Sequence, residues 1–167
     1  MIKPFLMYPD KRLRTVCAEV SVVDDAVRGI WGDMLNAMYK MPGVGLAAPQ
    51  IGVMQRLAVV DCSDTHNAAI LMANPEVIHA SAKMNEHEEA SPNLPGLSGK
   101  VERPRAVTVR YMNAEGDVVE KDFVHLWATS VQHQIDHLNG KLFVHLLSPT
   151  KRKMLLAKHA KNMKRRG

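Results

Sequence analysis

Two histidines set four residues apart, His133 and His137, have the clearest potential for chemistry in this sequence. On an α-helix these positions lie on one face about one turn apart, so both imidazoles can reach a single metal ion. A helix is indicated because a separate apolar stripe has helical spacing and is expected to pack on the core: Trp127, Val131, Ile135 and Leu138. The spacing alone leaves two interpretations open, a metal site or an ordinary polar face of a helix.

The residue after the first histidine departs from the usual zinc-hydrolase pattern. In that pattern a glutamate follows the first histidine and acts as general base toward the attacking water. Gln134 stands at this position, and a neutral carboxamide cannot take up that proton. The base is therefore missing from its expected place.

The elements that would position this helix follow a mixed order. Apolar residues at helical spacing predict a helix over 24–41, which Pro42-Gly43 ends. Runs rich in valine and leucine predict strands over 56–62 and 69–72, the second ending near Asn74-Pro75. The later elements are a hairpin over 106–124, the helix over 126–138 stopped by Gly140, and a last helix starting at Ser148-Pro149. Because no βαβ rhythm is present, we predict an α+β fold with short strands around the central histidine helix.

Composition restricts the class of protein. The 167 residues, 46% apolar and 23% charged, predict one globular domain over 1–167 and exclude a disordered or collagen-like chain. The two cysteines do not form a disulfide framework, so we expect a reducing, cytoplasmic setting. No apolar run approaches the roughly 20 residues of a membrane helix, and the N-terminal apolar stretch is too short for a secretory signal. No membrane partner is therefore expected.

The net charge of +5 is concentrated at the C-terminal end. Residues 151–167 hold eight basic residues and no acidic one, whereas the other 150 residues hold 14 basic and 17 acidic residues. Such a block is typical of a solvated helix face, but it also attracts phosphate backbones. Both interpretations stay open for the predicted basic helix and tail over 148–167. The second interpretation makes a nucleic-acid-associated protein one of the possible classes of function.

Several segments along essentially the whole chain carry a further signal. Two longer motifs, at 43–50 (GVGLAAPQ) and 132–138 (QHQIDHL), occur together with four short motifs, at 8–14, 74–76, 101–104 and 147–149, in a fixed order along the chain. In this order the chain resembles the peptide deformylase family. The resemblance implies that family's α+β fold and its reaction, removal of the formyl group from formyl-methionine at the N-terminus of nascent chains. It also implies a divalent metal, iron, zinc or nickel, held by His133 and His137.

The second motif of that family is altered here. The family has Glu-Gly-Cys-Leu-Ser before Pro-Gly, with the cysteine as third metal ligand. Aligned on Pro95-Gly96, this chain has Ser91 at the cysteine position and Pro92 at the next, whose N–H in the family helps to hold the formyl oxygen. A serine hydroxyl is a poor ligand for iron or zinc, and proline has no N–H. Together with Gln134, three changes fall on the reacting centre and predict little or no deformylase activity.

The rest of the pocket matches the family. By resemblance, Gln50 offers its side-chain amide to the formyl oxygen, while Gly43, Gly45 and Leu46 lie beside an extended peptide that pairs like a strand. The two glycines also have a simpler interpretation as turn residues after the first helix. We therefore expect a site that binds an N-terminal peptide or nascent chain without turnover, with Ser91 and Pro92 in its wall. The basic tail is a candidate contact to the ribosome.

One alternative keeps the enzyme active through an unusual ligand set. The segment 85–89 would supply His87 or Glu88 as third ligand, and Glu88 or Glu89 as base. Against it, His87 lies four residues before the serine, about 13 Å along an extended chain, and Glu89 is expected to pair with Arg103. Two imidazoles without a third protein ligand make a weak site, so a metal would be held weakly or not at all.

Overall fold

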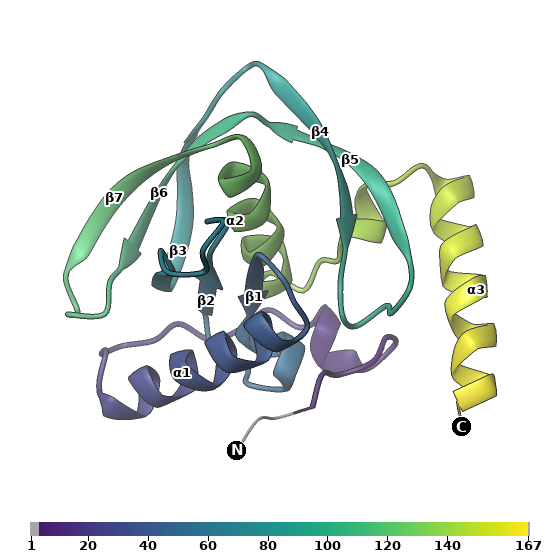
Figure 1. Cartoon of the computed structure of the whole chain (residues 1–167), viewed down its shortest axis with the longest axis horizontal. Coiled ribbons are helices and arrows are strands. Elements are labelled where there is room, and N and C mark those ends of the chain that lie inside the picture. Colours follow the sequence, from purple (N-terminus) through teal and green to yellow (C-terminus); the bar gives the residue numbers. More distant parts are fainter. Residues whose placement is uncertain (1–3, 167) are drawn as a thin grey trace.

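The computed structural model of the protein describes residues 4–166 (Figure 1). The helix α2 (His125–Leu138) lies at its centre, between a five-stranded sheet and a two-stranded hairpin. The other helices are α1 (Asp25–Lys40), α3 (Pro149–Arg166) and the short 3₁₀ helices η1 (Lys11–Arg14), η2 (Ala48–Ile51) and η3 (Phe143–Leu146). The strands are β1 (Gly45–Ala47), β2 (Leu57–Val60), β3 (Ile70–Ala80), β4 (Met84–Ala90), β5 (Ser98–Pro104), β6 (Ala106–Met112) and β7 (Val118–Val124). This arrangement confirms the predicted α+β fold around the histidine helix.

The main sheet is antiparallel throughout, with the strand order β1-β2-β3-β6-β7. Its β6–β7 pair confirms the hairpin predicted over 106–124, with Val109 opposite Lys121. Val107, Val109 and Tyr111 are buried, as the alternation along this strand predicts. At the other end, β1 pairs among residues 4–166 only with β2 and is an edge strand, so one side of its backbone has no partner among these residues in the sheet.

The first long helix forms as predicted. Asp24 caps α1, because its side chain accepts a hydrogen bond of 3.0 Å from the N–H of Val27. The apolar stripe of α1 packs on the sheet, where the buried Trp31 donates its indole N–H to the carbonyl of Met72 at 3.2 Å. The helix ends at Lys40 and leads directly into β1 through a short loop.

The third strand is longer than predicted. We expected a strand over 69–72 that stops near Asn74-Pro75, but β3 continues to Ala80 with an irregularity in its register between Ala73 and Glu76. A proline is tolerated at such a bulge because no ladder hydrogen bond is required of it there. Asn74 adopts φ 52° and its side-chain amide donates to the Val20 carbonyl at 2.7 Å, which holds the bulge in place.

The two-stranded hairpin β4–β5 was not predicted from the sequence. Its first strand reads MNEHEEA and is mostly exposed, so it has no apolar alternation to reveal it. The pairing is nevertheless regular over seven residue pairs, with His87 opposite Val101 and Glu89 opposite Gly99. Only Glu89, Val101 and Arg103 are buried in it, and two of these three are charged.

The central helix is buried on more sides than expected. Its apolar stripe packs on the sheet as predicted, although Trp127 is only partly buried. The histidine face was expected to be a separate polar face, but His133 and His137 are 7% and 1% exposed. This face is covered by the β4–β5 hairpin, whose Glu89 contacts His133, and by η3, whose Phe143 ring stacks on His133 at 6.3 Å. Gly140 ends the helix at φ 75°, as predicted, where a side chain would also overlap the backbone of Arg14.

The last helix lies at the edge of the molecule (Figure 1). Ser148 caps α3, accepting a hydrogen bond of 3.2 Å from the N–H of Lys151, as predicted. One face holds it to the body: His159 is buried with its Nε2 2.7 Å from the carbonyl oxygen of Tyr8, and Leu155 and Leu156 pack nearby. Gly167 of the predicted basic tail lies outside the described residues. Within residues 4–166, no helix is both long enough and apolar enough to span a membrane.

Candidate functional site

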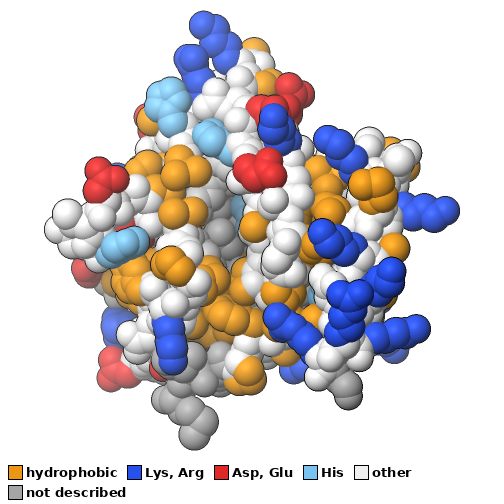
Figure 2. All heavy atoms as spheres, turned by 45° about the vertical axis from the view of Figure 1, so that its right-hand side comes forward, with side chains coloured by type: hydrophobic (Ala, Val, Ile, Leu, Met, Phe, Trp, Pro, Cys, Tyr) orange, Lys and Arg blue, Asp and Glu red, His pale blue; other side chains and the backbone are white. Residues whose placement is uncertain are grey.

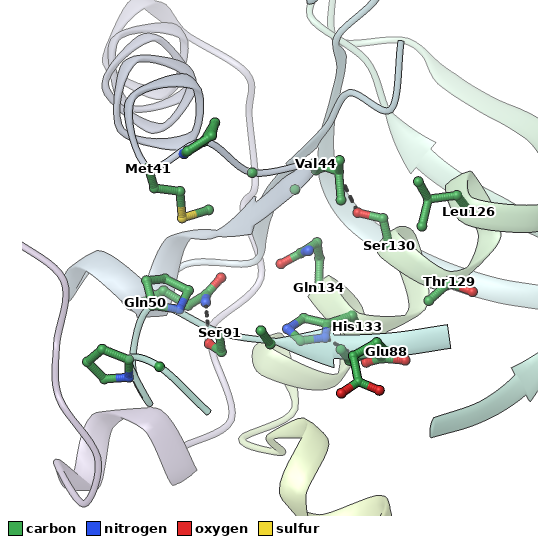
Figure 3. Close-up of a pocket in the computed structure, with 18 residues that line it drawn as sticks. Met41, Val44, Gln50, Glu88, Ser91, Leu126, Thr129, Ser130, His133 and Gln134 are labelled. Atoms are coloured by element: carbon green, nitrogen blue, oxygen red, sulfur yellow. Dashed lines mark hydrogen bonds and ion pairs between the residues drawn. The ribbon is translucent and has the colours of Figure 1, made fainter. Parts of the chain in front are cut away.

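A pocket of about 430 Å³ opens where α2, β1 and the β4–β5 hairpin meet (Figure 3). Its walls come from three parts of the chain: the loop and strand at 41–45 with Gln50, the stretch 88–92 with Pro95-Gly96, and one face of α2. The size lies within the range of about 300–1,000 Å³ that is usual for ligand pockets.

The two histidines turn their rings toward one another at the base of this pocket. His133 lines it, and His137 lies one turn further along α2. Their Nε2 atoms are 3.1 Å apart. Two nitrogen ligands of one tetrahedral metal, each about 2.1 Å from the ion, would be roughly 3.4 Å apart. The pair therefore has nearly the spacing that a shared ion requires.

A carboxylate sets the protonation of this pair. Glu89 Oε1 lies 2.8 Å from His133 Nδ1, and an ionised carboxylate only accepts hydrogen bonds, so Nδ1 carries the hydrogen. The Nε2 atoms of the two rings share one hydrogen bond. Burial, with the positive charge of Arg103 after it, lowers the pKa of His137 well below its usual value. His137 is therefore neutral at pH 7.

Glu89 itself is held by a buried ion pair. Arg103 Nε lies 2.7 Å from Glu89 Oε2 and Nη2 lies 2.9 Å from Oε1, which confirms the predicted pairing. Burial alone would raise the pKa of Glu89, but the hydrogen bonds from His133 and Arg103 outweigh it and keep this pKa below its usual value. Arg103 also donates from Nη1 to Asp136 Oδ2 at 2.9 Å, so a single guanidinium joins β4, β5 and α2.

The serine at the predicted ligand position takes part in a different network. The Ser91 hydroxyl accepts a hydrogen bond of 3.1 Å from Gln50 Nε2 and donates one of 2.9 Å to Asn93 Oδ1. Gln50 Nε2 gives its other hydrogen to Asn93 at 2.9 Å, and its Oε1 accepts from the Ala47 N–H at 2.8 Å. Both amide hydrogens of Gln50 are therefore engaged here, whereas the resemblance led us to expect them free for a formyl oxygen.

Gln134 is the polar side chain of the pocket that lacks partners. It is 4% exposed, and its carboxamide extends from α2 into the space between Val44 and Gln50 (Figure 3). Its Oε1 has no hydrogen-bond partner among the described residues. Gly45 allows this conformation, because a Cβ at that position would overlap Gln134 Nε2 and Ser130 Oγ. The glycine therefore serves close packing of α2 against β1 as well as any approach of a ligand.

The side chains around the histidines supply two protein ligands of a metal site and no third one among residues 4–166. Catalytic zinc sites use three protein ligands. Within residues 4–166, no group of three histidine, cysteine or carboxylate side chains is placed to hold an ion. His87, the alternative third ligand, has its Nδ1 2.8 Å from Thr129 Oγ1 instead, and Glu88 accepts from Ser98 at 2.8 Å. The residues present thus do not complete the site for iron, zinc or nickel that the resemblance implies.

Most residues singled out in the sequence meet at the pocket. Its lining includes Gly43, Gly45, Gln50, Ser91, Pro92, His133 and Gln134. The side chain of Leu46 does not reach it, because it is fully buried in the hydrophobic cluster between α1 and the sheet. His137 is likewise absent from the lining and supports His133 from the core side.

Three lining residues of α2 were missed. Leu126, Thr129 and Ser130 precede His133 by seven, four and three residues, which places all of them on one helical face. That spacing was available in the sequence, but two of the three are small polar residues and form no apolar stripe. Asn93 was also missed, because only the fold brings it to Gln50, which lies 43 residues away in the sequence.

The chain is similar to known proteins over almost its whole length. The sequence model described as polypeptide deformylase matches residues 2–153. The peptide deformylase of Hydrogenovibrio crunogenus is 43% identical over 158 residues, which is 95% of this chain and 93% of that protein. The crystal structure of a peptide deformylase from Legionella pneumophila has a TM-score of 0.92 at 39% identity, covering 99% of this chain and 98% of that one. A structure from Ehrlichia chaffeensis in complex with actinonin has a TM-score of 0.91 at 30% identity, covering 96% and 97% of the two chains. By sequence and by fold over nearly its whole length, this chain belongs to the polypeptide deformylase family.

Proposed function

We propose that this member of the family binds N-terminal peptides in the pocket and hydrolyses the formyl group slowly or not at all. The observation that carries the proposal is the network around Ser91. Its hydroxyl is engaged by Gln50 and Asn93, so it does not act as a third ligand beside the histidines. A serine hydroxyl is also far less acidic than a thiol, so it does not readily ionise to the alkoxide that would bind a metal.

The base for hydrolysis is also missing. Gln134 follows His133 and lines the same pocket, at the place where a carboxylate would accept the proton of the attacking water. A carboxamide has no basic oxygen of comparable strength, and the loss of a general base costs about 10²–10⁴ in rate.

The donors for a developing oxyanion are reduced as well. Pro92 lines the pocket without an N–H, and both hydrogens of Gln50 Nε2 are already used. Removing one such donor costs about 10²–10³ in rate. These penalties need not add, but they act in the same direction at one site.

The features that would bind a peptide do not depend on these groups. The edge strand β1 borders the pocket at Gly45, and its unpaired side can take an extended peptide as an additional strand. Met41, Val44 and Leu126 supply apolar surface for a side chain of that peptide.

Titration with tripeptides tests both halves of the proposal. We expect saturable binding of at least one peptide of a Met-Ala-Ser pair, one formylated and one free, by calorimetry. We expect formate release from the formylated peptide at the buffer background, with protein loaded anaerobically with iron or nickel. Val44→Trp should weaken binding because Val44 lines the pocket, whereas Val22→Trp, an exposed valine before α1, should not. Chelator-sensitive turnover would contradict the loss of activity, and no binding of either peptide at millimolar concentration would contradict the binding role.

A second candidate contact is favoured by the surface of α3. We propose that its basic face binds ribosomal RNA. Lysine and arginine side chains gather on this helix (Figure 2), and all but Arg152 of the basic residues over 151–166 are exposed. A helix attached by one face and charged on the others suits attraction to phosphates.

Salt dependence of RNA binding tests this contact. Neutralising four exposed residues should weaken binding and reduce the slope of log affinity against log salt by about one for each phosphate that the helix no longer neutralises: Lys158, Lys161, Lys164 and Arg165, each to Gln. The matched control removes the same charge elsewhere, at Lys11, Lys83, Lys100 and Lys121. Equal slopes for the two variants would contradict a specific role of α3. Substitution is preferable to deletion, because deletion also removes the contact between His159 and Tyr8.

A further inference from the structure

Asn93 lies behind the wall of the pocket and holds two other segments of the chain. Its side chain is fully buried and lies outside the described lining of the pocket. Asn93 Nδ2 donates to the carbonyl oxygen of Leu6 at 2.5 Å and to that of Gln50 at 3.3 Å. Because a carbonyl oxygen only accepts, these contacts use both amide hydrogens of Asn93 and fix which way its carboxamide is turned. Its Oδ1 then faces the side chains of Gln50 and Ser91.

The carboxamide of Gln50 is also held in one orientation. Its Oε1 accepts from the Ala47 N–H at 2.8 Å, and a backbone N–H only donates, so Nε2 is turned toward Ser91 and Asn93. One Nε2 hydrogen goes to Asn93 Oδ1 at 2.9 Å and the other to Ser91 Oγ at 3.1 Å. The Ser91 hydroxyl gives its own hydrogen to the same Asn93 oxygen at 2.9 Å. Asn93 Oδ1 therefore accepts from both side chains and closes a ring of three hydrogen bonds.

The closed ring withholds the Gln50 amide from a ligand. Gln50 and Ser91 both line the pocket (Figure 3), but every polar hydrogen of these two side chains already has an acceptor. The carboxamide of Gln134 makes no hydrogen bond within residues 4–166, so its Nε2 remains as a donor for a carbonyl oxygen in the pocket. A ligand that also needs Gln50 must first break a hydrogen bond of the ring, which costs binding free energy.

Building on the peptide binding proposed above, we infer that Asn93 is a positioning residue that withholds the Gln50 amide from a bound peptide. The pocket then holds a formyl oxygen more weakly than it would with Gln50 free. The two ends of the Asn93 carboxamide have separate effects, because Nδ2 fastens the backbone of Leu6 and Gln50, whereas Oδ1 captures hydrogens of the pocket wall. Loss of Oδ1 returns one hydrogen to Gln50 Nε2, on a side chain that already borders the cavity.

Titration of Asn93→Leu with two peptides tests the inference. Leucine keeps the volume and lacks Oδ1, so formyl-Met-Ala-Ser should bind about 3- to 10-fold more tightly than to the unmodified protein, the effect of roughly one hydrogen bond. Met-Ala-Ser has no formyl oxygen, and its affinity should change by less than about twofold. Adding Gln50→Leu to Asn93→Leu should remove the gain. No gain, an equal gain for both peptides, or a gain that survives Gln50→Leu would overturn the inference.

Asn113→Leu is the matched control for this titration. Asn113 Oδ1 also accepts two hydrogens, from the N–H groups of Glu115 at 3.1 Å and Asp117 at 3.0 Å, but it lies in the turn between β6 and β7. Its loss should leave the affinities for both peptides unchanged. If Asn93→Leu does not fold, Asn93→Ser replaces it, since the shorter serine side chain has no second arm to join Leu6 and the ring.

A measurement without peptide separates the inference from the proposed peptide binding. The side-chain amide signals of Gln50 in isotope-labelled protein are assigned by their loss in Gln50→Leu. Their hydrogens should exchange with solvent slowly in the unmodified protein and at least about tenfold faster in Asn93→Leu. Fast exchange in the unmodified protein, or equally slow exchange in both, would overturn the role of Asn93. Calorimetry in which no protein binds either peptide would instead overturn the proposed peptide binding.

Discussion

Replacing Arg103 with methionine should lower the free energy of unfolding by about 3–5 kcal/mol. The side chains of Arg103 and Glu89 are only 5% and 4% exposed, so the substitution leaves a buried carboxylate without its main counter-charge. It also removes the bond from Arg103 to Asp136 that joins the hairpin to α2. Urea unfolding followed by circular dichroism measures the change.

Two variants control this experiment. Arg110→Met removes ion pairs with Glu120 and Glu76 whose partners are half exposed or more, and should change the free energy of unfolding by no more than about 1 kcal/mol. Combining Arg103→Met with Glu89→Gln should recover part of the loss, because no charge is then left buried alone. A loss below about 1 kcal/mol for Arg103→Met would show that Glu89 is not held as a buried anion.

The second large effect is a gain of activity. The triple variant Ser91→Cys, Pro92→Leu and Gln134→Glu should release formate from formyl-Met-Ala-Ser at least about 10³-fold faster than the unmodified protein. A cysteine thiolate supplies a third ligand beside the two converging imidazoles. A glutamate supplies the base, and leucine restores a backbone N–H at the pocket wall.

Single substitutions should gain little, because groups that act as a unit give strongly non-additive effects. A chelator should abolish the activity of the triple variant, and bound metal measured by elemental analysis should rise from below one ion per chain toward one. A triple variant that binds metal but stays at the background rate would show that other residues of the pocket prevent turnover. A triple variant that binds none would show that the network of Gln50 and Asn93 still holds residue 91 away from the histidines.

The sequence predicted those parts of the structure that depend on local pattern. The helices predicted over 24–41 and 126–138 have clear apolar periodicity, and their C-terminal ends follow from Pro42-Gly43 and Gly140. The β6–β7 hairpin follows from the alternation over 107–111, the turn signal at 113–116 and the segment after it that can return as a partner. The resemblance to the family added the order of the motifs, and with it the meeting of Gln134 and Ser91 at one pocket.

What the sequence did not predict depends on contacts between distant segments. β4 is a strand because β5 pairs with it, although its own residues are mostly charged and exposed. The engagement of Ser91 depends on Gln50, which lies 41 residues away, and the orientation of His133 depends on Glu89, 44 residues away. No local sequence pattern predicts whether a buried polar atom will have a hydrogen-bond partner elsewhere in the chain. Gln134 Oε1 has none among residues 4–166.

The bridge from Arg103 to Glu89 and Asp136 makes the stability of the pocket walls independent of the residues that determine its chemistry. The bridge joins the hairpin to the central helix through residues that are not Ser91, Pro92 or Gln134. Substitutions at those three positions can therefore alter the chemistry while the cavity keeps its shape, since none of them carries the ion pairs that fix the walls. A substitution that alters the reactivity of this pocket therefore need not destabilise the fold.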